Sequence, residues 1–278
     1  MILLTGSTGF IGSNIIQSNL FPDISIISRN DLPSLEKFNN QTSKGASFFF
    51  HFASAITSDQ SKKDEEIKIL ENILNFCYKN DIPLIFPSTS FYESPNKNGS
   101  REDDKIILHN KYSQTKYECE LLIKDYVKQK NLNAIILRIF NVYGPSQPSH
   151  YFLPTLLKSI SNNIDISIFE NLKRDYVHVE DLVSLLYKIS NSKIQDLNIY
   201  NVGSGKNYSN KDILKMVLKY YKNYKKHTLE TSSIISPEAT LANISKASKN
   251  FGWMPKKNLN NFIENSVKNL TNKNNKNG

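Results

Sequence analysis

Short apolar runs alternate with longer amphipathic stretches along roughly the first two hundred residues. Several apolar runs are continuous rather than alternating, which is typical of parallel strands covered on both faces. The expected strands are Ile2–Thr5, Ile24–Ser28, Ser47–Ala53, Pro83–Phe86, Ala134–Ile139 and Leu197–Val202. The expected helices are Ile11–Leu20, Lys62–Lys79, Tyr112–Gln129 and Glu180–Asn191. This order predicts an α/β fold, a Rossmann-like doubly wound parallel sheet with right-handed crossovers.

A glycine-rich turn, Gly6-Ser7-Thr8-Gly9-Phe10-Ile11-Gly12, joins the first strand to the first helix. Glycines allow a tight turn and a close approach of the backbone to a pyrophosphate, which the helix N-terminus then faces. A glycine turn without a ligand is the alternative, but a strand before the turn and a helix after it are the context that the motif requires. We therefore predict dinucleotide binding by Gly6, Thr8, Gly9, Phe10, Ile11 and Gly12.

The pattern changes after Gly144, where we expect a helix at Phe152–Ser161, a short strand at Ile164–Phe169 and then mostly helices. We assign residues 1–145 to the dinucleotide-binding domain, with 175–203 returning to it. The remainder, 146–278, is predicted to be a smaller, mostly helical substrate domain. Its Asn/Lys-rich tail is expected to be disordered from about 271.

Composition and charge narrow the class of protein. The chain has 278 residues, 39% hydrophobic and 22% charged, so a sizeable core is expected and a disordered chain is excluded. Two cysteines are too few for a disulfide scaffold or a zinc cluster, so no metal is expected. No apolar run reaches the roughly 18 residues of a membrane span, and the N-terminus lacks signal-peptide features. We expect a reduced, cytoplasmic protein that has no membrane partner.

The net charge of +9 comes mainly from lysines spread through the helices and the tail. Lysine runs of this kind are usually solvated surfaces, so we do not predict a nucleic-acid partner. A basic cleft for an anionic small molecule fits the charge equally well.

The second chemical signal is a Tyr-x-x-x-Lys pair, but one or two such pairs are expected by chance from this composition. The matches are Tyr112/Lys116, Tyr126/Lys130 and Tyr221/Lys225. Position selects the first, because Tyr112 opens the helix that follows the Pro83–Phe86 strand, at the carboxyl edge where ligands bind. Residues four apart share a helix face, so Lys116 can stabilise a Tyr112 tyrosinate. An ordinary amphipathic helix remains the alternative.

The chain resembles the NAD(P)-dependent epimerase/dehydratase family of nucleotide-sugar enzymes, within the extended short-chain dehydrogenases/reductases. The resemblance rests on several motifs in the family's order, beginning with Gly-x-x-Gly-x-x-Gly and the Tyr112/Lys116 pair. The others are Phe50-His51-Phe52-Ala53, Ser88-Thr89-Ser90-Phe91-Tyr92, Leu137–Pro145, Arg174–Leu182, Tyr200–Gly203 and Gly252–Pro255.

The resemblance implies roles for further residues. Tyr112 and Lys116 would be catalytic and would contact the nicotinamide, while Phe52 and Ala53 would line the cofactor. Ser88 matches the hydroxyl that binds the reacting sugar oxygen, with its neighbours Thr89 and Ser90 as alternatives. Asn141 and Arg174 match residues that hold the nucleotide diphosphate. A homodimer is also implied, formed by the Lys62–Lys79 and Tyr112–Gln129 helices. The stripe Ile67, Leu70, Ile73, Leu74 and Cys77 offers partial support, although a plain core stripe explains it as well.

The sequence also departs from the family pattern at positions that usually belong to the active site. The helix before the Pro83 strand usually carries Asn-x-x-Gly-Thr, and here Glu66, Ile69 and Leu70 stand in those places. A second diphosphate arginine usually precedes the Asn243–Ala247 helix, where Ser233 falls instead.

These features favour hydride transfer at C4 of a nucleotide-diphosphate hexose, with Tyr112 exchanging a proton with the sugar oxygen. The segment from Arg29 to Ser47 is short, which suits a cofactor that exchanges at each turnover and hence a 4-keto-6-deoxysugar reductase. A 4-epimerase is the first alternative, and a non-catalytic NADP(H)-binding sensor is the second. A dehydratase is disfavoured, because in that subfamily an Asp-Glu pair follows the catalytic Ser/Thr, and here Thr89-Ser90 stands in its place.

Arg29 decides the expected cofactor. The family usually has an acid after strand two, which binds the ribose 2′-hydroxyl; here Ser28-Arg29-Asn30 stands there. An Arg29–phosphate contact worth about 1.5–3 kcal/mol predicts that NADP(H) is preferred roughly 10- to 150-fold, with NAD(H) possible. A solvated turn arginine is the alternative.

Overall fold

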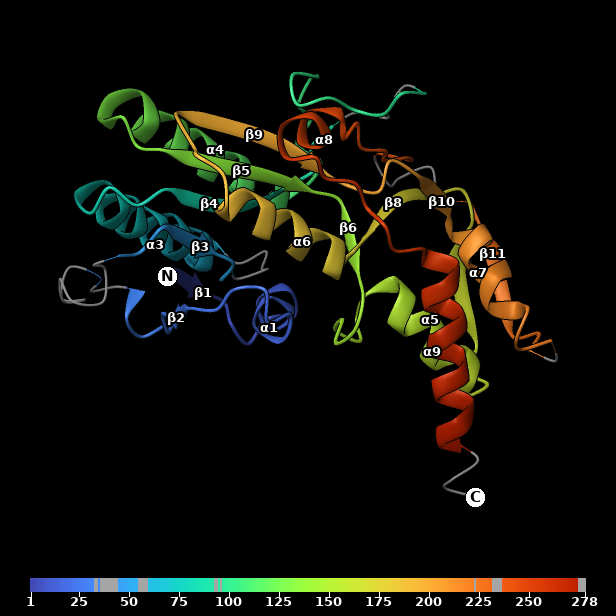
Figure 1. Ribbon diagram of the computed structural model, residues 1–278. Helices are drawn as coiled ribbons and strands as arrows, with labels where there is room; N and C mark the ends of the chain where they lie inside the picture. Colours follow the sequence, from blue (N-terminus) through green and yellow to red (C-terminus); the bar gives the residue numbers. More distant parts are fainter. Residues whose placement is uncertain are drawn as a thin grey trace.

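The chain folds around a six-stranded parallel sheet (Figure 1). The computed structural model describes residues 1–32, 35, 45–54, 60–92, 95, 97–222, 224–231 and 237–274. The strands are β1 (Ile2–Thr5), β2 (Ile24–Ile26), β3 (Phe48–His51), β4 (Leu84–Thr89), β5 (Ala134–Ile139) and β9 (Leu197–Val202). Their order is β2-β1-β3-β4-β5-β9, and every neighbouring pair is parallel. Because β2 and β3 lie on opposite sides of β1, the predicted doubly wound α/β fold is confirmed.

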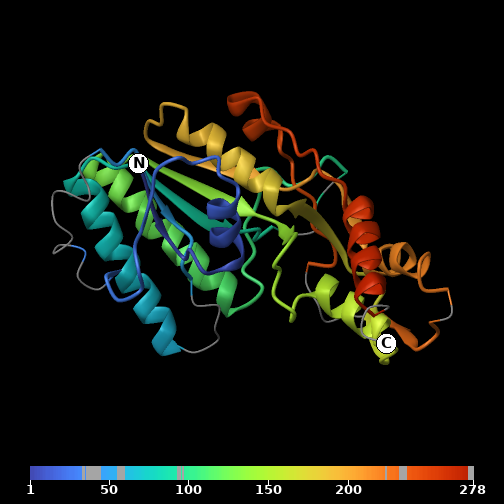
Figure 2. The ribbon, with the colours of Figure 1, turned by 60° about the horizontal axis from the view of Figure 1, so that its bottom comes forward.

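Helices cover both faces of this sheet (Figure 2). One face carries α3 (Gln60–Lys79) and α4 (Lys111–Lys130), and the other carries α1 (Phe10–Gln17) and α6 (Val179–Ser190). Successive strand residues point to opposite faces, so Leu3 packs in one core and Leu4 in the other. Burial on both faces explains why the strands are continuously apolar.

The apolar stripe of α3 is part of this core. Leu70, Ile73, Leu74 and Cys77 are fully buried beneath the helix, and Ile67 packs against them. The chain's own sheet therefore accounts for the stripe, which lends no support to a dimer.

A smaller unit lies beyond the carboxyl ends of the strands (Figure 1). Its helices are α5 (Phe152–Ser161), α7 (Asn210–Leu218) and α9 (Leu259–Asn274). A three-stranded sheet, β10-β8-β6, consists of β6 (Asn141–Tyr143), β8 (Lys173–His178) and β10 (Asn207–Ser209). A two-stranded sheet pairs β7 (Ile166–Phe169) with β11 (His227–Glu230). The sequence did not predict β6, β8, β10 and β11, because they are short and mix polar with apolar residues.

The segment 175–203, which we expect to return to the dinucleotide-binding domain, contacts both units. It begins in β8 of the three-stranded sheet, Val177 packs in the core of the large unit, and α6 and β9 follow. Helix α8 (Ser245–Phe251) and Trp253 pack in the core of the large unit, where Trp253 Nε1 donates to the Asp181 carbonyl at 2.9 Å. Helix α9 extends into the tail that was expected to be disordered, and 275–278 lie outside the described residues.

Among the described residues, no helix combines the length and apolar character needed to cross a membrane.

Candidate active site

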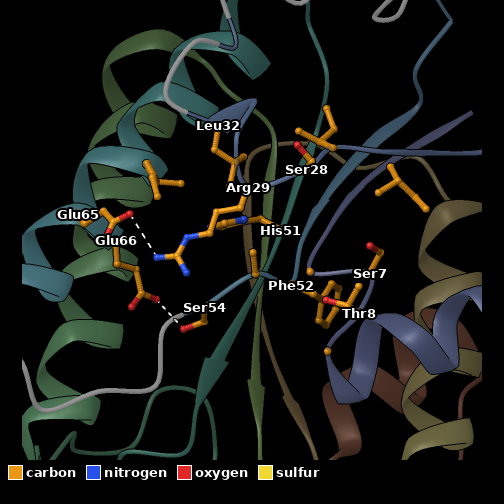
Figure 3. A pocket seen from close by; sticks show the side chains of 16 residues that line it. Ser7, Thr8, Ser28, Arg29, Leu32, His51, Phe52, Ser54, Glu65 and Glu66 are labelled. Atoms are coloured by element: carbon orange, nitrogen blue, oxygen red, sulfur yellow. Dashed lines mark hydrogen bonds and ion pairs between the residues drawn. The ribbon is translucent and has the colours of Figure 1, made fainter.

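A cavity of about 400 Å³ opens where the loops after β1, β2 and β3 meet (Figure 3). This is the switch point of the doubly wound sheet, where crossovers leave β1 and β3 in opposite directions and open a crevice at the carboxyl ends. The lining residues come from the three loops and from α3: Gly6–Gly9, Ile26–Arg29, Leu32, His51–Ser54, Glu65, Glu66 and Ile69.

The glycine loop has room only for backbone at two positions. Gly6 has φ +76°, and a Cβ there would lie 2.5 Å from the Ala53 nitrogen. A Cβ on Gly12 would lie 2.0 Å from the Gly6 carbonyl oxygen, so the loop and α1 pack backbone against backbone. No side chain caps the N-terminus of α1, and its first turn has no acidic residue. The loop therefore fits an anionic pyrophosphate, as a dinucleotide cofactor requires.

Most of the predicted cofactor residues meet at this cavity. Gly6, Thr8, Gly9, Arg29, Phe52 and Ala53 line it. The other predicted cofactor residues lie outside the lining: Phe10, Ile11 and Gly12 in the first turn of α1, and Tyr112 and Lys116 in α4. The motifs missed Ser54 and Glu65, because no pattern in the sequence shows that the loop after β3 and helix α3 close this side of the cavity.

Arg29 extends across the cavity toward α3 (Figure 3), where its Nη2 lies 3.3 Å from Glu65 Oε1. The turn after β2 brings Asp31 back to the strand end, where Asp31 Oδ2 accepts hydrogen bonds from the Ser28 nitrogen at 3.0 Å and from Ser28 Oγ at 2.5 Å. A carboxylate thus stands beside the end of β2, although Asp31 itself lies in the turn that follows the strand. The carboxylates of Glu65 and Asp31 would both repel a 2′-phosphate beside Arg29.

The start of α4 brings Tyr112 and Lys116 together. Asn110 caps the helix, and its Oδ1 accepts a hydrogen bond from the Ser113 nitrogen at 2.8 Å, which fixes where the helix begins. Lys116 Nζ lies 6.0 Å from the centroid of the half-buried Tyr112 ring and 4.8 Å from that of Phe86. The ammonium therefore lies beside the phenol, as the spacing predicted.

Lys116 also has a partner that the motifs did not reveal. Lys116 is 2% exposed, and its Nζ donates to Glu66 Oε1 at 2.9 Å. Burial alone would lower the pKa of Lys116, but its charge interactions with Tyr112 and Glu66 hold that pKa above the ordinary value. Burial, and then the charge of Lys116, lower the pKa of nearby His51 to about 3, so this imidazole is neutral.

Ser88, the residue before the last of β4, has a buried hydroxyl whose oxygen has no hydrogen-bond partner among the described residues. Strand alternation puts Ser88 on the same face as Phe86, the face that α3 and α4 cover. Thr89 and Ser90 follow and are half-buried. A buried hydroxyl without a partner is costly, so this one suits an external oxygen.

Asn141 and Arg174 lie on the neighbouring strands β6 and β8 and do not line the cavity. Asn141 is exposed and pairs in register with Tyr176. Arg174 Nη1 donates to the carbonyls of Lys173, at 2.8 Å, and Glu238, at 3.0 Å, which orients the guanidinium. Ser233, at the place of the second family arginine, lies outside the described residues.

A buried network connects β5 and β9 with helix α4 and with the segment that follows β4. Arg138 of β5 donates to both carboxylate oxygens of Glu120 in α4, at 3.0 and 2.8 Å. Its Nη1 donates to Tyr92 Oη at 2.9 Å, and Tyr92 Oη donates to Asn201 Oδ1 of β9 at 2.7 Å. Because Tyr92 belongs to this network, the network holds the far end of the segment Ser88–Tyr92 in place.

Comparisons with known proteins agree with this geometry. Residues 2–203 match the NAD dependent epimerase/dehydratase family. The dTDP-4-dehydro-6-deoxyglucose reductase of Escherichia coli is 26% identical, with 97% of each chain covered. The ADP-L-glycero-D-manno-heptose-6-epimerase of Brachyspira hyodysenteriae is 28% identical, with 80% of this chain and 81% of the relative covered. The UDP-glucuronic acid 4-epimerase of Bacillus cereus, solved with UDP-glucuronic acid and NAD, has a TM-score of 0.82 and 24% identity, with 98% of this chain and 99% of that one covered. The chain belongs to the NAD-dependent epimerase/dehydratase family.

Proposed function

We propose that the chain is an NAD(P)(H)-dependent oxidoreductase of nucleotide-diphosphate sugars, with hydride transfer at C4 of a hexose, and that it works as a 4-keto-6-deoxysugar reductase. The observation that carries the proposal is the buried Lys116 ammonium beside the Tyr112 ring, at the edge of the sheet that holds the glycine-loop cavity. The relatives act on nucleotide sugars by their names, which supports the same substrate class here.

The residues have distinct tasks in this reaction. A reduced nicotinamide supplies the hydride to C4 when the cofactor is bound. Tyr112 donates its phenolic proton to the C4 carbonyl oxygen, so the ketone gains one hydride and one proton and becomes an alcohol. Lys116 stabilises the tyrosinate until solvent returns the proton. Ser88 donates a hydrogen bond to the same sugar oxygen, with Thr89 and Ser90 as alternatives, and Asn141 and Arg174 bind the diphosphate.

The choice of a reductase over a 4-epimerase rests on the sequence: the segment between Arg29 and Ser47 is short, which suits a cofactor that exchanges at each turnover, and the Escherichia coli reductase is a relative over nearly all of both chains. The short segment between Arg29 and Ser47, which suggested an exchangeable cofactor, lies largely outside the described residues. Thr89 and Ser90 follow Ser88, so the acid pair of a dehydratase is absent from the sequence there.

An assay with a nucleotide-linked 4-keto-6-deoxyhexose and NADPH tests this proposal. We expect one NADPH to be consumed for each alcohol formed, and freshly purified protein to carry no stoichiometric nucleotide by mass spectrometry. Tightly retained NAD, with 4-epimerisation and no net redox turnover, would contradict the reductase and favour the epimerase. Cofactor binding without either reaction would favour the sensor.

The preference for NADP(H) is a further part of the proposal and depends on Arg29. Because Glu65 pairs with Arg29 and Asp31 stands nearby, we expect the low end of the range, a preference of about tenfold. Arg29→Ala should abolish it, and Glu65→Gln should increase it by releasing the guanidinium. Titration of both cofactors into the wild type and both variants measures this. Equal affinities in all three proteins would show that Arg29 does not read the 2′-phosphate.

We also propose a homodimer formed through α3 and α4, where Tyr78 and Leu121 are exposed apolar side chains. Sedimentation at micromolar concentration should give about twice the 31.8 kDa of one chain. Leu121→Glu should shift the protein to monomer, whereas a wild-type monomer would refute the dimer. Placement in the cytoplasm stays a prediction.

A further inference from the structure

A buried carboxylate contacts the lysine of the proposed active site, and no step described above uses it. Glu66 of α3 is 8% exposed. Its Oε1 accepts hydrogen bonds from Lys116 Nζ at 2.9 Å and from Ser54 Oγ at 2.8 Å. Glu66 and Ser54 both line the cavity, as Figure 3 shows, so this carboxylate connects the cavity wall to the lysine.

We propose that Glu66 is a positioning residue whose carboxylate keeps the Lys116 ammonium charged and fixed beside Tyr112. The inference rests on the proposed reaction, because it assigns Glu66 a role at that site. Ser54 holds the carboxylate from the cavity side.

The other groups that face Lys116 cannot replace this charge. From β3 comes His51, which is neutral because burial and Lys116 itself lower its pKa to about 3. From β4 comes the uncharged ring of Phe86. From α4 come Tyr112 and Cys119, and burial raises the pKa of the Cys119 thiol to about 12, so it is neutral as well. Among the described groups around Lys116, Glu66 is therefore the one that supplies negative charge before Tyr112 ionises.

Glu66 also determines how the site responds to pH. Burial favours the neutral amine, so Lys116 without a counter-charge loses its proton more easily. The proposed reaction needs the charge on Lys116, so a lysine that loses its proton at lower pH shortens the active range at its alkaline end. The loss of activity at high pH should therefore begin at lower pH when the charge of Glu66 is removed by substitution.

Glu66→Gln keeps the shape of the side chain and removes its charge. The alkaline limb of kcat/KM for ketone reduction is expected to move down by about 1–2 pH units. The matched control is Glu118→Gln, which removes a partly exposed ion pair with Lys63, at 2.8 Å, between the same two helices. In the control, the alkaline limb of kcat/KM should stay at the wild-type pH. Glu66→Asp, which restores the charge, should move the limb back toward the wild-type position.

A second measurement needs neither substrate nor cofactor. In the wild type the raised pKa of Lys116 stabilises the fold at neutral pH, and this contribution is lost only as the pH rises through that raised value. In Glu66→Gln the buried lysine should have a lowered pKa, so the variant gains stability as the pH rises toward the ordinary lysine value of about 10.4. The difference in Tm between the two proteins should therefore shrink from about pH 7 to about pH 10.

The two measurements separate failure of this inference from failure of the proposed function. If no sugar nucleotide reacts, the proposed function fails, and the Tm difference still tests the ion pair. If the Tm difference shrinks but the alkaline limb of kcat/KM does not move, the ion pair is purely structural and the positioning role is overturned. A Tm difference that stays constant with pH would overturn the inference as well. If Glu66→Gln does not fold, Glu66→Gln/Lys116→Met should fold, because it removes the charge together with its partner. Failure of that double variant would also overturn the inference.

Discussion

Tyr112→Phe is expected to lower kcat for the proposed reduction by about 10²–10⁴-fold, because it removes the proton donor to the sugar oxygen. Cofactor binding should change little, since Phe retains the ring beside Lys116 and the glycine loop is untouched. Initial rates at saturating substrate and a cofactor titration measure the two effects separately.

Tyr126→Phe is the matched control, because Tyr126 and Lys130 satisfy the same motif further along α4. Tyr126 Oη donates to Asn75 Oδ1 at 3.1 Å, and Tyr126 packs against the core beneath α3 and α4. This variant should keep the wild-type kcat. Full turnover in Tyr112→Phe would remove Tyr112 from the reaction, and unchanged biological activity in that variant would favour the sensor.

The second large effect concerns stability. Glu120→Gln should lower the free energy of unfolding by about 3–5 kcal/mol, because it leaves the buried Arg138 guanidinium without its counter-charge. A loss of 1 kcal/mol lowers Tm by about 2–4 °C in chains of 150–250 residues, so Tm should fall by roughly 6–20 °C.

Glu118→Gln, two positions earlier in α4, is the comparison for this effect. Its ion pair with Lys63 is partly exposed, so the expected loss is about 0–1 kcal/mol. Thermal unfolding of the three proteins at one pH measures the difference. Equal losses in the two variants would show that the Arg138–Glu120 pair does not hold the strand ends together.

The parallel sheet could be predicted because its strands are buried on both faces and their apolar runs are therefore unbroken. The Tyr112/Lys116 pair could also be chosen from among three matches, because a ligand site in such a sheet lies at the carboxyl edge. Apart from β7, the strands that the structure describes in the smaller unit could not be predicted. β8, for example, begins Lys-Arg-Asp and takes its place only by pairing with β6 and β10.

Site residues could be predicted where a single segment contains a recognisable motif. They were missed where two segments distant in the sequence come into contact only through packing. Glu66 is 50 positions from Lys116, and the two meet only because α3 packs beside α4. The Arg29–Glu65 pair has the same origin. Asp31 lies in the turn after β2, and its side chain turns back to the end of the strand, a contact that the sequence pattern does not show.

Transfer of a labelled hydride would test directly whether the nicotinamide cofactor reduces the sugar at C4. The protein would be incubated with a nucleotide-linked 4-keto-6-deoxyhexose and NADPH that carries deuterium at the transferable position of nicotinamide C4. If hydride is transferred to C4, we expect one deuterium at C4 of the sugar alcohol and one oxidised cofactor for each product formed. A product without deuterium at C4, or sugar conversion with no cofactor oxidised, would contradict this transfer.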